Sequence, residues 1–262
     1  ESAMALSQKY GVELEPLMLH ITDLLGRFRN EALKDTCKRV GGDQWLPIIY
    51  AAQVASDADN WFVGADMYNI STYATGNGWV TSYSSCGYNL LKAIEFATGE
   101  NDSNSVAQCK ILLANTVWES SMLYGDIPYS EAWNIEGTQT PKFDTQKDVF
   151  YSVIGLLDEA LDGIDESNSK RIDKYDIYYT GDMAKWRRLG NSLKLKFYMY
   201  LANKEDVGDE IKAIIDGGEL MNSSADDFVF PFYTTPGNQN PNYQLTVCLL
   251  YTSDAADDLI GV

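Results

Sequence analysis

The sequence predicts a mainly α-helical protein made of irregular, tetratricopeptide-like helix pairs joined by several long loops. Apolar side chains recur at spacings of three and four residues, which is typical of helices with one buried face. Short turns separate neighbouring segments, so we expect antiparallel pairs that cover each other's apolar faces. No clean repeat of about 34 residues is present in the sequence. The segments with helical spacing are 15–28, 45–55, 83–96, 103–124, 146–161, 183–203 and 207–215.

Capping residues mark where two of the long helices begin and end. Asp102 or Ser103 can cap a helix whose end is marked by Gly125. Thr145 stands three residues before Asp148, which is an aspartate version of the capping box. These signals predict two long helices joined by one connection.

Local signals also define the last part of the helical pattern. Asp182 is expected to cap the helix of residues 183–203, and two glycines, Gly217 and Gly218, are expected to follow the short helix after it. The apolar and aromatic residues of 226–232 predict a brief strand.

The connection between the two long helices includes residues 124–133, with the sequence YGDIPYSEAW. Asp126 is expected to hold a turn, Pro128 to fix the direction of exit, and Trp133 to pack the segment back onto the helices. Asp126 and Glu131 also flank the proline, and glycoside hydrolysis requires two carboxylates on either side of one bond. Of these two interpretations we favour the structural corner.

Charge and composition argue against several classes of function. The 262 residues carry a formal net charge of −18 and a pI near 4.3. Binding to nucleic acid or to an anionic lipid surface needs clustered lysines and arginines, so neither is expected. The sequence contains no apolar run of about 18 or more residues, so it predicts no transmembrane helix.

Motifs for metals and cofactors are absent from the sequence. His20 is the only histidine and has no neighbouring ligand residues at metal-binding spacing. No glycine-rich loop leads into a helix in the way that phosphate binding requires. We therefore expect no metal and no cofactor.

Residues 247–262 have no relation to the preceding pattern. The stretch CLLYTSDAADD, residues 248–258, resembles the translated adapter of a transposase-based sequencing library. We expect a partial helical domain over residues 1–246 and a non-native tail over 247–262. Without the three aspartates of the tail the net charge is −15, and the remaining cysteines are too few and too separated for a disulfide framework. These cysteines are Cys37, Cys86 and Cys109.

The aromatic loop of residues 57–79 is the strongest candidate for ligand contact. Sugar rings stack on aromatic side chains through their C–H faces, while Asn and Asp side chains bond sugar hydroxyls. The alternative is that these rings pack against neighbouring helices. A second tyrosine-rich loop, residues 165–181, is either another contact loop or a packed crossover. The candidate ligand-binding residues are Asp57, Asn60, Trp61, Tyr68, Tyr73 and Tyr178.

Three ordered blocks between residues 105 and 203 identify a family resemblance. The blocks are YGDIPYSEAW, PKFDTQKDVFYSVIGLLDEAL and YTGDMAKWRRLGNSLKLKFYMYLAN, and a later NPNY, residues 240–243, also fits. Together they resemble the SusD-like (SusD/RagB) family of outer-membrane lipoproteins. The resemblance implies a helical fold built on tetratricopeptide-like pairs, and a chain truncated at both ends.

The resemblance also implies a function. Members of this family are cell-surface, non-catalytic proteins that bind glycans or similar nutrients and act with a SusC-like TonB-dependent transporter. They are held at the outer membrane by a lipidated N-terminal cysteine, which this sequence does not include. We therefore expect an oligosaccharide-binding subunit of an uptake complex and no enzyme. A helical scaffold for a protein partner and a helical glycoside hydrolase using Asp126 and Glu131 are the alternatives.

Overall fold

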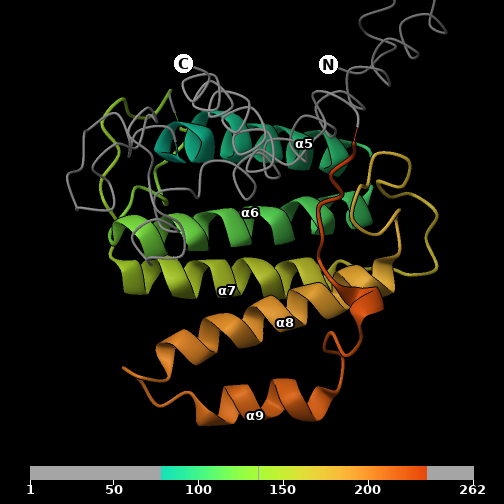
Figure 1. Cartoon of the computed structure of the whole chain (residues 1–262). Helices are drawn as coiled ribbons and strands as arrows, with labels where there is room; N and C mark the ends of the chain where they lie inside the picture. Colours follow the sequence, from blue (N-terminus) through green and yellow to red (C-terminus); the bar gives the residue numbers. More distant parts are fainter. Residues whose placement is uncertain (1–77, 135, 235–262) are drawn as a thin grey trace, which may run out of the picture. The chain divides into compact units, whose positions relative to one another are not determined.

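The computed structural model describes residues 78–134 and 136–234 of the chain. Within these ranges, residues 82–228 form one compact unit, while 78–81 and 229–234 belong to a second unit. Helices are the only regular elements of the described part (Figure 1). They are the π-helix η3 (Thr81–Gly87), α5 (Tyr88–Gly99), α6 (Ser103–Tyr124), α7 (Gln146–Asp162), α8 (Met183–Leu201), α9 (Gly208–Gly217) and the short 3₁₀ helix η4 (Ser224–Asp226).

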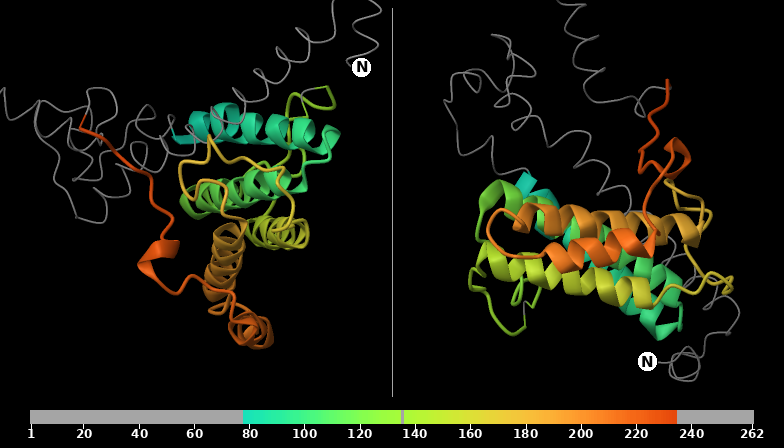
Figure 2. Two further views of the ribbon diagram at one scale, coloured as in Figure 1. Left: turned by 90° about the vertical axis from the view of Figure 1, so that its right-hand side faces the viewer. Right: turned by 90° about the horizontal axis from the view of Figure 1, so that it is seen from below.

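The five α-helices of the first unit form a stack in which each helix runs back along its predecessor (Figure 1). Each helix from α5 to α9 packs on the next, and α6 also contacts α8. The turned view shows the helices following one another down the stack (Figure 2). This arrangement of antiparallel pairs confirms the predicted fold class.

α6 is the most deeply buried helix, with 15 of its 22 residues buried. Burial on several faces follows from its position, because α5, α7 and α8 all pack against it. Near its C-terminal end the Trp118 ring stacks on Phe197 of α8, with ring centroids 4.9 Å apart. Cys86 and Cys109 are buried free thiols, as expected for small apolar residues in a helical core.

The predicted caps of α6 and α7 are present. The Asp102 carboxylate accepts a hydrogen bond from the backbone N–H of Ser105 (3.0 Å), and Gly125 ends α6 with a φ of 78°. Thr145 Oγ1 accepts from the N–H of Asp148 (3.1 Å) and donates to the Asp148 carboxylate (2.7 Å). The aspartate therefore bonds the hydroxyl of the N-cap residue, whereas in a full capping box it would reach the backbone N–H.

The hairpin of α8 and α9 follows the predicted pattern, except that α8 ends at Leu201 instead of residue 203 and α9 includes Gly217, which was expected to follow it. Asp182 caps α8 by accepting a hydrogen bond from the N–H of Lys185 (3.1 Å). Gly217 is the last residue of α9, and Gly218 follows in the left-handed conformation, with a φ of 71°. Only a glycine takes this conformation without steric cost, so the helix stops here.

The predicted strand at residues 226–232 is wrong. Ser224–Asp226 form the 3₁₀ helix η4, and the following residues up to 232 have no strand pairing. The Asp226 carboxylate is already engaged by Arg188, at 2.9 Å, which fixes a local turn. Pro231 lacks an N–H for a ladder, so an apolar run alone was not enough to form a strand.

The segment after α6 forms a compact corner. Ile127 and Asp144 exchange two backbone hydrogen bonds, 3.2 and 2.9 Å, which close the loop between them. The Trp133 indole N–H donates to the Tyr83 carbonyl (2.7 Å), and the two rings lie 5.3 Å apart. The Tyr83 hydroxyl in turn donates to the Pro128 carbonyl (2.7 Å). Trp133 therefore docks the corner onto η3, which confirms its predicted packing role.

The docking of Trp133 can be tested at Gly87. A Cβ at this position would lie 2.2 Å from the Trp133 ring, so Gly87→Ala forces the indole to move. We expect the free energy of unfolding to fall by about 1–3 kcal/mol, measured by chemical denaturation. Gly155→Ala is the matched control, because its Cβ meets nothing within 4 Å and alanine favours the helix by about 1 kcal/mol. Equal midpoints for Gly87→Ala and the parent chain would contradict the docking role.

Candidate functional site

The structure places one of the six predicted ligand-binding residues. Tyr178 lies in the connection between α7 and α8 and is half-buried. Its ring stacks on Phe228, with centroids 4.0 Å apart, and meets the Trp186 ring edge-on at 6.2 Å. One face of the Tyr178 ring is thus packed inside the protein. The other five predicted residues, Asp57, Asn60, Trp61, Tyr68 and Tyr73, lie outside the described residues and stay predictions.

The Asp176 carboxylate holds the loop that carries Tyr178. One of its oxygens accepts from the backbone N–H groups of Tyr178 (3.0 Å) and Tyr179 (3.1 Å). The other oxygen accepts from the Gly181 N–H (2.8 Å) and from the indole N–H of Trp186 (2.7 Å). Asp176 is only 2% exposed, so these four donors supply the bonds that a buried carboxylate needs.

Tyr179 links this loop to the turn after α9. Its hydroxyl donates to the backbone carbonyl of Asp226 (2.7 Å). Burial raises the pKa of Tyr179 well above its ordinary value, and the negative charges of Asp226 and Asp176 raise it further. The phenol therefore stays protonated and remains a donor. Tyr178 and Tyr179, which the sequence does not distinguish, thus have different surroundings.

The acids of the corner bond to backbone N–H groups. Asp126 accepts from the N–H of Gln146 at the start of α7 (2.8 Å), and Glu131 accepts from the N–H of Lys142 (3.0 Å). Both carboxylates therefore close the loop, which is the structural interpretation of this motif. The arrangement offers no support for the acid pair of a hydrolase.

Asp144 is the third acid of the corner. It accepts from the N–H groups of Tyr129 (2.9 Å) and Ser130 (2.7 Å) and from the Ser130 hydroxyl (2.7 Å). Partial burial opposes its ionisation, but these hydrogen bonds outweigh that effect, so the pKa of Asp144 lies below its ordinary value. The carboxylate is thus held charged as a structural anchor.

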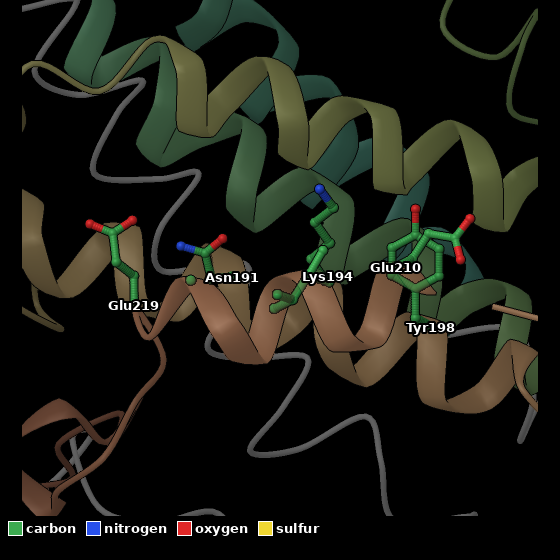
Figure 3. A pocket seen from close by; sticks show the side chains of 8 residues that line it. Asn191, Lys194, Tyr198, Glu210 and Glu219 are labelled. Carbon is green, nitrogen blue, oxygen red and sulfur yellow. The ribbon is translucent and has the colours of Figure 1, made fainter. Parts of the chain in front are cut away.

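A cleft of about 310 Å³ lies between α8 and α9, and its lining was not predicted from the sequence. Figure 3 shows the labelled polar side chains in a row along this helix pair. The cleft lies within the first unit, and its volume is at the lower end of the range of small-molecule sites. The lining residues are Asn191, Lys194 and Tyr198 of α8, Glu210, Ala213, Ile214 and Gly217 of α9, and Glu219 beyond it.

The polar groups of the cleft differ in their partners. Lys194 forms an ion pair with Asp158 of α7, so its charge is already balanced. The side chains of Asn191, Glu210 and Glu219 make no hydrogen bond or ion pair with residues in 78–134 or 136–234. Burial raises the pKa of Tyr198, so its hydroxyl remains a neutral donor and acceptor. The cleft therefore offers free hydrogen-bonding groups above an apolar floor.

The cleft could have been anticipated from the sequence, because the helices predicted over 183–203 and 207–215 follow one another after a short turn and should pack together. Asn191, Lys194 and Tyr198 are spaced by three and four residues, so they share one face of α8. A helix followed by a short turn and another helix predicts that such a face meets its neighbour. Sequence alone does not say whether facing side chains fill the space or leave a cleft.

The described residues contain no group of three potential metal ligands. Within the same ranges, no helix is both long and apolar enough to cross a membrane.

Together these features define a protein of stacked helix pairs, with a tyrosine-bearing loop held by the Asp176 carboxylate and a polar cleft between two of its helices. A family model described as starch-binding and associating with the outer membrane matches residues 28–259. The chain belongs to this SusD-like family. The matched range includes part of the segment 247–262, and the boundary of the expected tail stays a prediction. None of the curated proteins matches the chain.

Solved structures agree with the fold. A SusD/RagB family protein from Bacteroides thetaiotaomicron superposes with a TM-score of 0.71 over 84% of this chain, at 23% identity. A SusD homologue from Parabacteroides distasonis has the same TM-score and coverage at 20% identity. A chitin-binding protein reaches a TM-score of 0.54 over 63% of this chain at 27% identity. The chain covers 48%, 44% and 36% of these three proteins, so it spans less than half of their length.

The role of Asp176 can be tested by Asp176→Asn. The substitution places an amide donor against N–H groups that now face a carboxylate oxygen, leaving buried donors unpaired. We expect a loss of about 3 kcal/mol in the free energy of unfolding and faster hydrogen exchange at the amides of Tyr178 and Gly181. Asp162→Asn is the control, since Asp162 is exposed at the end of α7 and should change stability by less than about 0.5 kcal/mol. Unchanged exchange at both amides would contradict the role.

Proposed function

We propose that this chain is the binding part of an outer-membrane nutrient-uptake complex, capturing an oligosaccharide for a SusC-like TonB-dependent transporter. The family match over residues 28–259 carries the proposal, because its description combines starch binding with the outer membrane. The protein would be held at the cell surface by a lipid anchor at its N-terminus. It would act by binding alone, and the backbone bonds of Asp126 and Glu131 support a non-catalytic role.

The aromatic loop of residues 57–79 remains the proposed place of capture. Trp61 and Tyr73 would stack on sugar rings, while Asp57 and Asn60 would bond hydroxyl groups. Tyr68 completes the loop's set of contacts. For Tyr178, the stack on Phe228 supports a packing role over contact by both ring faces, which leaves its ring edge and hydroxyl as possible contacts.

The proposed capture site predicts a specific loss on substitution. Trp61→Ala should weaken binding of the best oligosaccharide from a neutral glycan panel about ten-fold, since a stacked ring contributes about 1.4 kcal/mol. Isothermal titration calorimetry measures the affinity. Tyr151→Ala, which removes an exposed tyrosine of α7 outside both candidate loops, should leave it unchanged. Equal affinity of Trp61→Ala and the parent chain would remove Trp61 from the site, and no binding to any glycan would argue against the function.

The transporter partnership has its own test. The gene next to this one on the source DNA should encode a TonB-dependent transporter, and the two proteins, expressed with their native signals, should copurify from solubilised outer membranes. A transporter of unrelated sequence is the control. Separate elution of the two proteins would contradict the partnership while leaving the binding function intact.

A further inference from the structure

The cleft between α8 and α9 has the construction of a ligand site. Its α9 side is formed by residues 210, 213, 214 and 217, which share one helical face. On this face Ala213 and Ile214 present apolar side chains and Gly217 has none, so the α9 side of the cleft is an apolar floor. The α8 side presents Asn191 and Tyr198, about 10 Å apart along the helix. An apolar floor beside polar groups suits a sugar ring, which has C–H faces and hydroxyl edges.

Acids line the two ends of the cleft. Glu210 stands at the first turn of α9, and Glu219 follows its C-terminal cap. Figure 3 shows these two carboxylates at opposite ends of the row of side chains. The end near Glu219 is tied to α8, because the N–H of Met221 donates to the Ser192 hydroxyl (2.9 Å). Glu219 is therefore carried on a segment that follows α9 and is tied to α8, while Glu210 lies on α9 itself.

The charges of the residues that line the cleft determine which ligands it favours. Lys194 is its only cation and is paired with Asp158, while Glu210 and Glu219 have no ion-pair partner among the described residues. Two unbalanced negative charges repel phosphate, uronic acid and other anions. They attract an ammonium group, and carboxylates are strong acceptors for its N–H donors.

We infer that this cleft binds an amine-bearing saccharide, with a sugar ring on the Ala213 and Ile214 floor and its ammonium group at Glu210 or Glu219. The inference rests on the proposed function for the ligand being a saccharide, and it adds a second subsite that selects by charge. The site is separate in sequence from the aromatic loop of residues 57–79.

A series of disaccharides that share one linkage tests the selection. The parent chain is titrated at pH 6 with the β-1,4 disaccharide of glucosamine, with cellobiose, with diacetylchitobiose and with a cellobiose oxidised to its uronic acid. An amine of this type is largely protonated at that pH. We expect the glucosamine disaccharide to bind about ten-fold more tightly than cellobiose, and the acidic sugar not to bind. The preference should shrink as salt is raised from 20 to about 500 mM, because partly exposed charges are screened.

Two kinds of variant locate the site. Gly217→Phe fills the cleft, since a Cβ at this position has open space around it and the backbone has no unusual φ. Gly155→Phe is the matched control, because it puts the same ring on an open glycine of α7 outside the cleft. The double variant Glu210→Gln and Glu219→Gln keeps the shape and removes the charge. We expect Gly217→Phe and the double variant each to reduce binding of the glucosamine disaccharide to the level of cellobiose, which the aromatic loop of residues 57–79 still binds.

The outcomes separate this inference from the proposed function. Equal affinity for the amine and neutral disaccharides, or a preference that survives the double variant, overturns the charge-selecting subsite and leaves capture by the aromatic loop in place. Normal binding by Gly217→Phe overturns the location. Should that variant fail to fold, as judged by circular dichroism, the double variant still decides. Loss of neutral-glycan binding in Trp61→Ala, with binding of the glucosamine disaccharide retained, would support both sites.

Discussion

The long connection between α7 and α8 depends on buried amide side chains of α6. Gln108 bonds the backbone of Ile172 in both directions, donating to its carbonyl (2.9 Å) and accepting from its N–H (3.0 Å). Asn104 makes the same kind of pair with Asp165, at 2.8 Å each way. Both amides are at most 1% exposed, so each must be paired, and the connection supplies the partners. The bonds from Gln108 and Asn104 fix the connection after α7, and the helices that follow it, α8 and α9, are positioned from there.

The start of α8 follows from this anchoring. Asp176 lies a few residues beyond Ile172 and bonds both the Tyr178 loop and the Trp186 indole on α8. Because α8 is held at its first turns, the hairpin with α9 and the cleft between them are held by the same core. A change in Gln108 should therefore affect the cleft, although the two lie on different helices. This dependence is physical, since a loop without strand pairing must satisfy its backbone groups with side chains.

Features with a local cause could be predicted from the sequence. The caps at Asp102, Thr145 and Asp182 depend on residues three positions away, and the corner depends on a glycine, an aspartate and a proline that are close together. Pairings between distant residues could not, because nothing near Gln108 in the sequence indicates Ile172 as its partner. The strand at residues 226–232 failed for a related reason. An apolar run becomes a strand only when a partner strand is present, and this part of the chain has none among the described residues.

The candidate sites show why residue type alone is a weak guide to function. Asp126 and Glu131 flank Pro128 and suggested a catalytic acid pair, but both carboxylates accept hydrogen bonds from backbone N–H groups and close a loop, as Asp144 also does. Glu210 and Glu219 have no distinctive motif around them, yet their charges are unbalanced by any neighbour in the described structure. In a chain with a net charge of −18, acids are too frequent for their presence to be informative. A carboxylate whose bonds are all made within the fold contributes to stability, and one that faces a cleft without a partner can still gain free energy by binding. Whether a carboxylate stabilises the fold or can bind a ligand depends on its hydrogen-bond and ion-pair partners, and these are set by the three-dimensional structure.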